Sequence, residues 1–268
     1  MKFNIGEKIH FYTTTDSTQN NAKDLIECAH DVEDVVNVVI VSGEQLRGYG
    51  RRGSLWYSPQ GGLWCSVVLE PMIGSGTRLK STHHLSILAC SAAVQSIERL
   101  YNLNLSIKWP NDIMYKDKKL GGVLVEVYPC YKKDTTYYFP IVGIGINVNN
   151  EIAEEIAKIA VSIKEILQYE VNITELLMKL LGTFNYFYYG EYKSYRLSRL
   201  MHFYRKKNYL LSHRVKVINA DIDKKSSDVD RDSIIEGVVV GIDNDGKLLL
   251  HSGKNSVIEV ISGHVEEV

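Results

Sequence analysis

The chain has 268 residues, of which 45% are hydrophobic and 24% are charged, a composition typical of a folded globular protein. It excludes a chain that is mainly disordered. The 31 Lys and Arg residues nearly balance the 32 Asp and Glu residues, so the formal net charge is −1. No overall positive field attracts polyanions, and we therefore expect neither nucleic acid nor a membrane as a partner.

The compartment follows from what the sequence lacks. No stretch approaches the ~20 apolar residues that cross a bilayer, and the amino terminus has no apolar signal core, so we expect a cytoplasmic protein. Cys28, Cys65, Cys90 and Cys130 lie 37, 25 and 40 residues apart. These spacings fit neither a disulfide framework nor paired zinc ligands. We expect reduced packing cysteines and no direct metal-binding motif.

The first half of the chain predicts strands around one long helix. β-branched or apolar runs predict five strands, at 35–42, 63–69, 105–109, 122–128 and 138–148. Apolar residues recur with a period of 3.6 over 82–101, which predicts a core-facing helix. Gly143 and Gly145 stand inside the last strand, and glycine there marks close approach by a ligand or another backbone.

The next segments predict helices. Residues 152–160 are helical by pattern, and Ser162-x-x-Glu165 and Asn172-x-x-Glu175 resemble capping boxes that open two further helices. The tyrosine-rich segment 176–209 is predicted to continue as helix. We interpret its aromatic stripe as packing: Phe184, Phe187, Tyr188 and Tyr195.

Beyond residue 210 the pattern changes to short strands, which are expected at 215–218, 234–242, 247–251 and 257–261. Asn244-Asp245-Gly246 supplies hairpin turn chemistry between two of them. The charged stretch 221–232 is predicted to be a mobile loop. We expect a main domain over residues 1–210 and a small β-barrel or sandwich over 211–268.

A loop rich in arginine and glycine follows the first predicted strand. Arg47, Arg51 and Arg52 fall within six positions, and no acidic residue occurs from Gln45 to Leu69. The same loop contains Gly43, Gly48, Gly50 and Gly53. Uncompensated guanidinium groups on a permissive backbone suit capture of carboxylate or phosphate, although a solvated basic loop is the alternative.

Gly48-x-Gly50-x-x-Gly53 formally matches the dinucleotide fingerprint of an NAD-dependent oxidoreductase. That fingerprint requires a helix to open at the third glycine, whereas the chain continues as SLWYSPQGG. The sequence also lacks the phosphate loop of P-loop nucleotide-binding proteins. Both of these nucleotide folds are therefore disfavoured.

Two further polar clusters end predicted strands. Lys108-Trp109-Pro110-Asn111-Asp112 is followed by KKLGG, and a tight turn between the two strands would bring Asp112 near Lys119. A surface salt bridge is the alternative to a catalytic pair. Asn147 in an apolar strand needs partners for its amide, which suits either an adenine edge or a cross-strand backbone group.

The segments SGEQLRGYGRRGSLWYSPQGGLWCSVVL, KWPND, KLGGVLVE and GIGINVN, preceded by Asp16-Ser17-Thr18, resemble the biotin protein ligases. The resemblance implies an α+β fold: a mixed β-sheet with flanking helices, shared with class II aminoacyl-tRNA synthetases, plus a small C-terminal β-barrel. Residues 1–210 would be the catalytic domain that binds biotin and ATP. Because the chain starts some 15 residues before Ser17, we expect the monofunctional form that lacks a DNA-binding domain.

The resemblance implies a two-step reaction. ATP and biotin, with Mg²⁺, give biotinyl-5′-AMP and pyrophosphate, and a lysine of a biotin carboxyl carrier domain then displaces AMP. Lipoate ligases and octanoyltransferases are the rival enzymes, and a noncatalytic carrier-binding module is a third possibility. Sequence is silent on oligomeric state and on which carboxylase is modified.

The resemblance also assigns residues. Lys119, Arg51 and Asp112 match the catalytic positions. The positions that match biotin contacts are Ser17, Thr18, Gln19, Gln45, Gly48, Tyr49, Gly50, Arg51, Trp64, Lys119 and Gly122. Those that match the adenylate site are Arg51, Arg52, Trp56, Lys108, Lys119 and Asn147. Tyr49 and Ser54 replace arginines of the stronger motif, and Gln19 replaces an asparagine. We expect the loop to be mobile when empty.

Overall fold

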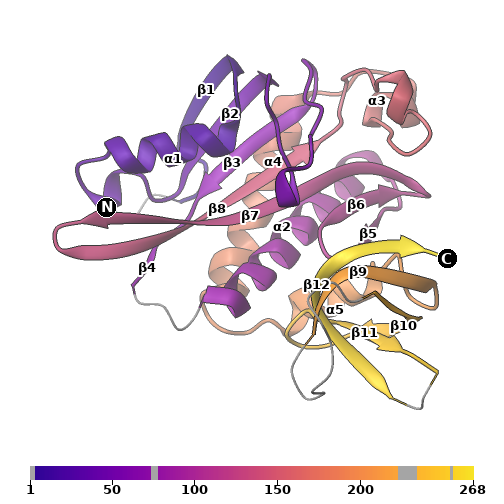
Figure 1. The fold of residues 1–268 in the computed structure, drawn as a ribbon. Helices are drawn as coiled ribbons and strands as arrows, with labels where there is room; N and C mark the ends of the chain where they lie inside the picture. Colours follow the sequence, from indigo (N-terminus) through magenta and orange to yellow (C-terminus); the bar gives the residue numbers. More distant parts are fainter. Residues whose placement is uncertain (1–3, 74–77, 223–233, 254–255) are drawn as a thin grey trace.

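An eight-stranded mixed sheet forms the centre of the computed structural model (Figure 1), which describes residues 4–73, 78–222, 234–253 and 256–268. The strand order is β1 (Lys8–Thr15), β2 (Val38–Gln45), β3 (Leu63–Val68), β8 (Thr135–Ile146), β7 (Lys118–Lys132), β6 (Asp112–Tyr115) and β5 (Ser106–Lys108). A short β4 (Met72–Ile73) also pairs with β8. Only the β1–β2 pair is parallel among these.

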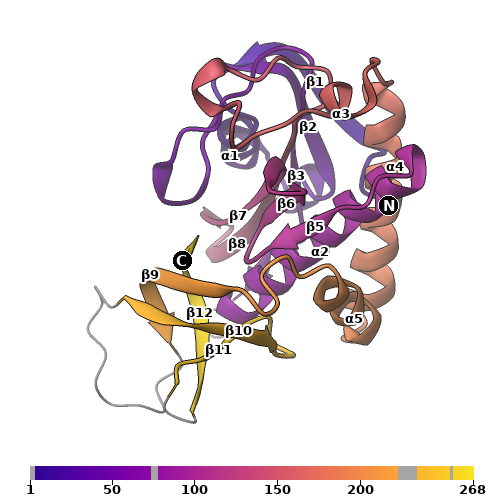
Figure 2. The ribbon, with the colours of Figure 1, turned by 90° about the vertical axis from the view of Figure 1, so that its right-hand side faces the viewer.

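Helices cover both faces of this sheet, because the side chains of a buried strand alternate between its two faces. Val39 and Val41 of β2 join the apolar cluster that contains α2 (Arg78–Tyr101) and α4 (Ile173–Phe187). Val38 and Ile40 join the smaller cluster on the opposite face, with α1 (Thr18–Cys28). Figure 2 shows this layering from the side.

The two predicted capping motifs begin helices. Ser162 Oγ accepts from Glu165 N at 3.3 Å and Glu165 Oε2 accepts from Ser162 N at 2.9 Å, which opens α3 (Ile163–Leu167). Asn172 Oδ1 accepts from Glu175 N at 3.1 Å and opens α4. Each bond satisfies a backbone N–H that the first turn of a helix leaves without a partner.

The C-terminal part is a four-stranded antiparallel β domain. Its strands are β9 (Arg214–Ile222), β10 (Ile235–Ile242), β11 (Leu248–His251) and β12 (Val257–Glu267), and each pairs with two others in a closed ring. The predicted hairpin turn is present, with Gly246 at φ +86°. The expected α+β fold is confirmed. The apolar core runs continuously from the sheet into this domain, and the boundary at residue 211 stays a prediction.

Two predicted helices are wrong in extent. Residues 152–160 contain only a 3₁₀ turn (Glu154–Ile156), because Ile159 O accepts from Lys119 N at 2.8 Å and draws the segment alongside β7. The segment 176–209 is interrupted: α4 ends in a π turn (Tyr188–Tyr192), and α5 (Ser198–Lys206) begins after a break. Tyr195 lies in this break and is 93% exposed, so its assignment to packing is wrong.

The structure bears on several smaller predictions. Cys65, Cys90 and Cys130 are buried, whereas Cys28 is exposed and does not pack in the core. The expected mobile loop at 221–232 falls mainly on residues 223–232, outside the described residues. Among the described helices, none has the length and apolar character that a membrane crossing requires. The remaining 3₁₀ turns are Val32–Asp34 and Arg51–Gly53.

Candidate active site

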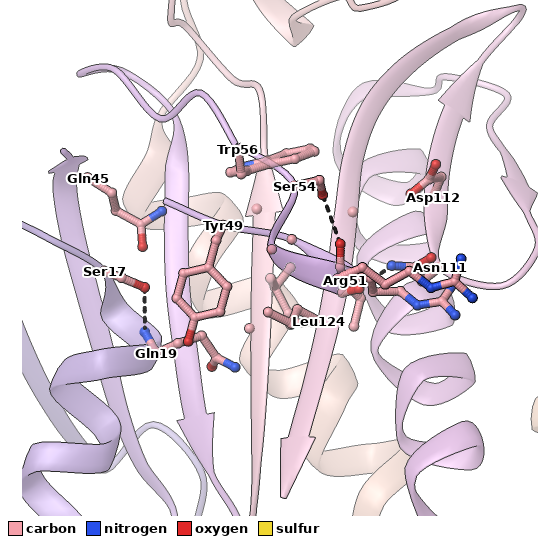
Figure 3. Close-up of a pocket in the computed structure, with 18 of the residues that line it drawn as sticks. Ser17, Gln19, Gln45, Tyr49, Arg51, Ser54, Trp56, Asn111, Asp112 and Leu124 are labelled. Atoms are coloured by element: carbon pink, nitrogen blue, oxygen red, sulfur yellow. Dashed lines mark hydrogen bonds between the residues drawn. The ribbon is translucent and has the colours of Figure 1, made fainter. Parts of the chain in front are cut away.

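A cavity of about 440 Å³ lies among the arginine-glycine loop, the ends of β6, β7 and β8, and the C-terminal domain. Figure 3 shows residues of the loop, the strands and α1 that line it. The cations Arg51, Arg52 and Lys119 line it, whereas Asp112 is the one acidic side chain among its described lining residues. His264 of β12 also reaches it. An excess of fixed positive charge in a partly enclosed space favours anionic ligands.

Asp112 and Lys119 form an ion pair in this cavity, with Lys119 Nζ 2.7 Å from Asp112 Oδ1. Asp112 pairs with Gly122, which lies three residues after Lys119 on β7. Because successive side chains of a strand point to opposite faces, strict alternation would turn Lys119 and Asp112 to opposite faces of the sheet. A shift of register between Ile113 and Met114 places one extra residue on β7, so Lys119 pairs with Met114 and faces the same side as Asp112. The bulge therefore creates the pair.

Arg51 forms no ion pair within the described residues. It extends from the loop toward Asn111 and Asp112 (Figure 3). Burial, together with the charge of Arg52, lowers the pKa of its guanidinium. Arg52 instead donates to Asn219 O of β9 at 3.2 Å. An unpaired, partly buried guanidinium is suited to bind a carboxylate or phosphate.

Two buried polar atoms in the cavity wall lack partners in the described part of the chain: Trp56 Nε1 and Gln19 Oε1. Buried polar groups are nearly always hydrogen-bonded, so such atoms mark where a ligand binds. The Trp56 ring lies over Gly145, where a Cβ atom would come within 2.6 Å of Nε1. Lys119 Nζ lies 5.0 Å from the centre of this ring.

The residues at the amino end of α1 tie the helix to β2 and β3. Gln45 Oε1 accepts from Thr18 N at 2.9 Å and from Thr18 Oγ1 at 3.1 Å, and Gln45 Nε2 donates to Ser58 Oγ at 2.9 Å. Ser17 caps the helix and accepts from Gln19 N at 3.3 Å. All of these except Ser58 line the cavity. The Gln45 amide is therefore already used to join the wall of the cavity.

Most of the residues that the sequence analysis assigned meet here. Those that line the cavity are Ser17, Thr18, Gln19, Gln45, Tyr49, Gly50, Arg51, Arg52, Trp56, Asp112, Lys119 and Gly122. Four do not. Trp64 is buried behind Trp56, edge to face at 6.5 Å, and donates to Pro59 O. Gly48 packs on Ser58 and accepts from Trp56 N.

The other two lie away from the cavity wall. Lys108 Nζ lies 3.2 Å from Glu267 Oε1, a carboxylate 159 positions later in the sequence. The Asn147 amide oxygen accepts from Asn150 Nδ2 at 3.2 Å, and Asn147 N donates to Leu120 O. In this structure their side chains support the walls rather than the ligand space.

The structure adds lining residues that the motifs did not assign, among them Asn111, Leu124, Gly143 and Gly145. Gly143 and Gly145 were detectable in the sequence, because a glycine inside a strand indicates close approach by a ligand or another backbone. Gly263 and His264 belong to the C-terminal domain and have no recognisable motif. Their presence shows that this domain completes the cavity.

Comparisons with known proteins identify the family. The profile described as "Biotin/lipoate A/B protein ligase family" matches residues 11–147, and "Biotin protein ligase C terminal domain" matches residues 229–266. The bifunctional ligase/repressor BirA of Bacillus subtilis is 27% identical over 266 residues, which cover 98% of this chain and 74% of BirA. The biotin–[acetyl-CoA-carboxylase] ligase of Paracoccus denitrificans is 33% identical over 117 residues, 41% of this chain and 43% of that protein.

Among solved structures, the biotin protein ligase from Aquifex aeolicus in complex with biotin and ATP superposes with a TM-score of 0.74. It is 27% identical in sequence, and the match covers 98% of this chain and 99% of that one. The first of the two profiles spans half of the sequence. The chain belongs to the biotin/lipoate A/B protein ligase family.

Proposed function

We propose that this protein joins biotin to ATP as biotinyl-5′-AMP and transfers the biotinyl group to a lysine of a biotin carboxyl carrier domain. The observation that carries this proposal is the cavity itself, in which Arg51 and Lys119 come from distant segments to one space. The Aquifex aeolicus ligase, which matches nearly the whole chain, is bound to biotin and ATP. The named relatives are biotin ligases, which favours biotin over lipoate.

The first step brings two anions together. An oxygen of the biotin carboxylate attacks the α-phosphorus of ATP, the bond from that phosphorus to the bridging oxygen breaks, and pyrophosphate leaves. Arg51 is free to neutralise the carboxylate and the α-phosphate, and Lys119 lines the same cavity. Cations fixed in place before the reaction stabilise the charge that develops on phosphate oxygens.

The Asp112–Lys119 ion pair connects the two steps. An α-phosphate that attracts Lys119 competes with Asp112 for the ammonium group, and the carboxylate is then released to bind the incoming carrier lysine. A free lysine has a pKa of about 10.4 and arrives mostly protonated, so a carboxylate is needed to orient it and to help its proton leave. The amine then attacks the acyl carbon and AMP departs.

Trp56 is proposed to stack on the adenine and to donate its free Nε1 hydrogen to the adenylate. Mg²⁺ would enter with the phosphates of ATP, since this ion usually binds through one or two carboxylates plus substrate phosphates. Within the described ranges no three His, Cys, Asp or Glu side chains gather as a metal site, and Asp112 is the carboxylate nearest to the ligand space.

The test is to incubate the full chain with ATP, Mg²⁺, biotin and a carrier domain, and to locate the modified lysine by mass spectrometry. We expect one biotinylated lysine and one AMP per transfer. A parallel reaction with lipoate in place of biotin distinguishes a biotin ligase from a lipoate ligase. Binding of the carrier domain without release of AMP would indicate a noncatalytic carrier-binding module. Modification with lipoate but not with biotin would overturn the proposal.

A further inference from the structure

A single carboxylate, Glu126 of β7, organises three side chains, two from α1 and one from the arginine-glycine loop. Glu126 of β7 accepts from Lys23 of α1 at Oε1, at 3.1 Å. Its Oε2 accepts from Gln19 Nε2 at 2.8 Å and from Tyr49 OH of the arginine-glycine loop at 2.8 Å. Gln19 and Tyr49 line the cavity, as Figure 3 shows, whereas Glu126 and Lys23 are not among its lining residues.

The direction of each hydrogen bond in this network is fixed by chemistry. An ammonium group only donates and an ionised carboxylate only accepts. Lys23 therefore donates to Tyr49 OH at 2.9 Å, and Tyr49 donates to Glu126 Oε2 at 2.8 Å, a shorter contact than its 3.3 Å to Asn20 Oδ1. Burial lowers the pKa of Lys23, but its bonds to Tyr49 and Glu126 outweigh burial and raise it, so Lys23 stays charged. Burial raises the pKa of Tyr49, which stays protonated.

The same constraint sets the orientation of the Gln19 amide. Only its amino group can face the carboxylate, so its carbonyl oxygen is turned away from Glu126. That oxygen is buried and has no partner among the described residues, and Gln19 as a whole is 4% exposed. A Cβ atom at Gly143 would lie 3.2 Å from it, so the glycine leaves this oxygen its space.

We propose that Glu126 is a positioning residue, which holds the Gln19 carboxamide so that its carbonyl oxygen accepts an N–H group of the bound substrate. This inference deepens the proposed function and rests on it. The ureido ring of biotin carries N–H groups, whereas the dithiolane ring of lipoate carries none. A site built to hydrogen-bond one ligand leaves its own buried groups unpaired with the other, and this is how it discriminates.

Two of the three departures from the family's motif meet at this carboxylate. Gln19 stands where an asparagine is usual, and Tyr49 stands where the loop motif has an arginine. The Tyr49 hydroxyl and the Gln19 amide contact one oxygen of Glu126, so the two replacements act on the same group.

The experiment compares Glu126→Gln with wild type in biotin-dependent adenylation and in calorimetric binding of biotin alone. The new amide matches the size of the carboxylate but also donates, so the Gln19 amide is free to turn over. We expect the KM and Kd for biotin to rise about tenfold or more, with kcat and the KM for ATP little changed. The preference for biotin over lipoate falls by the same factor.

Two further variants make the test specific. Glu27→Gln is the matched control, because Glu27 on α1 likewise accepts from a β7 tyrosine, Tyr128 OH at 2.7 Å, but lies away from the cavity. It should behave as wild type. Gln19→Met removes the proposed acceptor, and adding Glu126→Gln to it should cause little further loss, because residues that act through one another are not additive.

An unchanged Kd for biotin in Glu126→Gln overturns the positioning role alone. An equal rise in the KM for biotin and the KM for ATP overturns it as well, since it indicates a general structural defect. So do additive effects of Glu126→Gln and Gln19→Met on the Kd for biotin. Failure of the wild-type chain to bind biotin would overturn the proposed function together with this inference.

Discussion

Gly145→Ala tests how closely Trp56 must sit against β8. Gly145 has no positive φ, so alanine is compatible with the backbone, and the change acts only through the new methyl group. That methyl would lie 2.6 Å from Trp56 Nε1 and 2.9 Å from Cε2. Contacts between such atoms lie near ~3.5 Å, so the indole must move by about 0.9 Å into the cavity.

The shift disturbs the placement of Trp56 against two neighbours at once, Trp64 with its edge-to-face contact and the Lys119 ammonium at 5.0 Å. A misplacement of about 1 Å at a reacting centre costs on the order of 10²-fold in rate. We therefore expect kcat/KM for ATP to fall by about 10–100-fold. Trp56 is on a loop that can yield, so the loss of stability should stay at the lower end of the ~1–3 kcal/mol range for overpacking.

The assay is AMP formation at varied ATP, with the melting temperature measured in parallel. Gly241→Ala is the control, because its Cβ atom would meet only Leu249 Cδ1, at 3.9 Å. The reasoning is refuted if Gly145→Ala keeps the wild-type KM for ATP and the wild-type turnover, or if the control loses as much activity.

Three other predictions follow from the site and its supports. Asp112→Asn should leave biotinyl-5′-AMP formation largely intact and slow transfer to the carrier by about 10²–10⁴-fold, which rapid-quench measurement of each step would show. Trp109→Phe removes the bond from Nε1 to Gly246 O at 2.9 Å. It should cost about 1–3 kcal/mol of unfolding free energy and ~2–4 °C of Tm for each kcal/mol, measured by calorimetry. Burial and the nearby Arg51 lower the pKa of His83, so its contribution to stability is complete above the unfolded pKa of 6.5 and is lost as pH falls from there toward the folded value. His83→Gln should flatten the fall of Tm below pH 6.5, and an unchanged slope would contradict this assignment.

Much of the sheet was predictable because its strands are buried on both faces. The runs at 63–69 and 138–148 are continuous in apolar residues, and the structure has β3 and β8 there. β1 gave no such signal. It is an edge strand with mostly exposed side chains, so neither face imposes an apolar pattern on its sequence.

The helix α1 was missed for a reason connected with function. Only Ala22 and Ile26 of its apolar residues are fully buried, whereas Thr18 and Gln19 are buried polar residues that line the cavity. Positions that would otherwise carry an apolar stripe face the ligand space instead. Local sequence rules are expected to fail most often at functional sites of this kind.

The assignments that differ most from the structure depend on side-chain partners that lie outside the recognised motifs. Lys108 is the last residue of β5, as predicted, but its side chain pairs with Glu267 of the C-terminal domain, which no local pattern reveals. Asn147 is held by Asn150, three residues on. The proximity of Lys119 and Asp112 was predictable from the hairpin, while the bulge that turns both to one face was not.

The central claim is that Arg51 and Lys119 allow a carboxylate and a triphosphate to react in one cavity. Isotope exchange between pyrophosphate and ATP reports this step directly, without a carrier domain. We predict exchange that requires biotin in the wild-type chain and that falls by about 10²–10³-fold in Lys119→Met. Exchange in the absence of biotin, or exchange at the wild-type rate in Lys119→Met, would contradict the account.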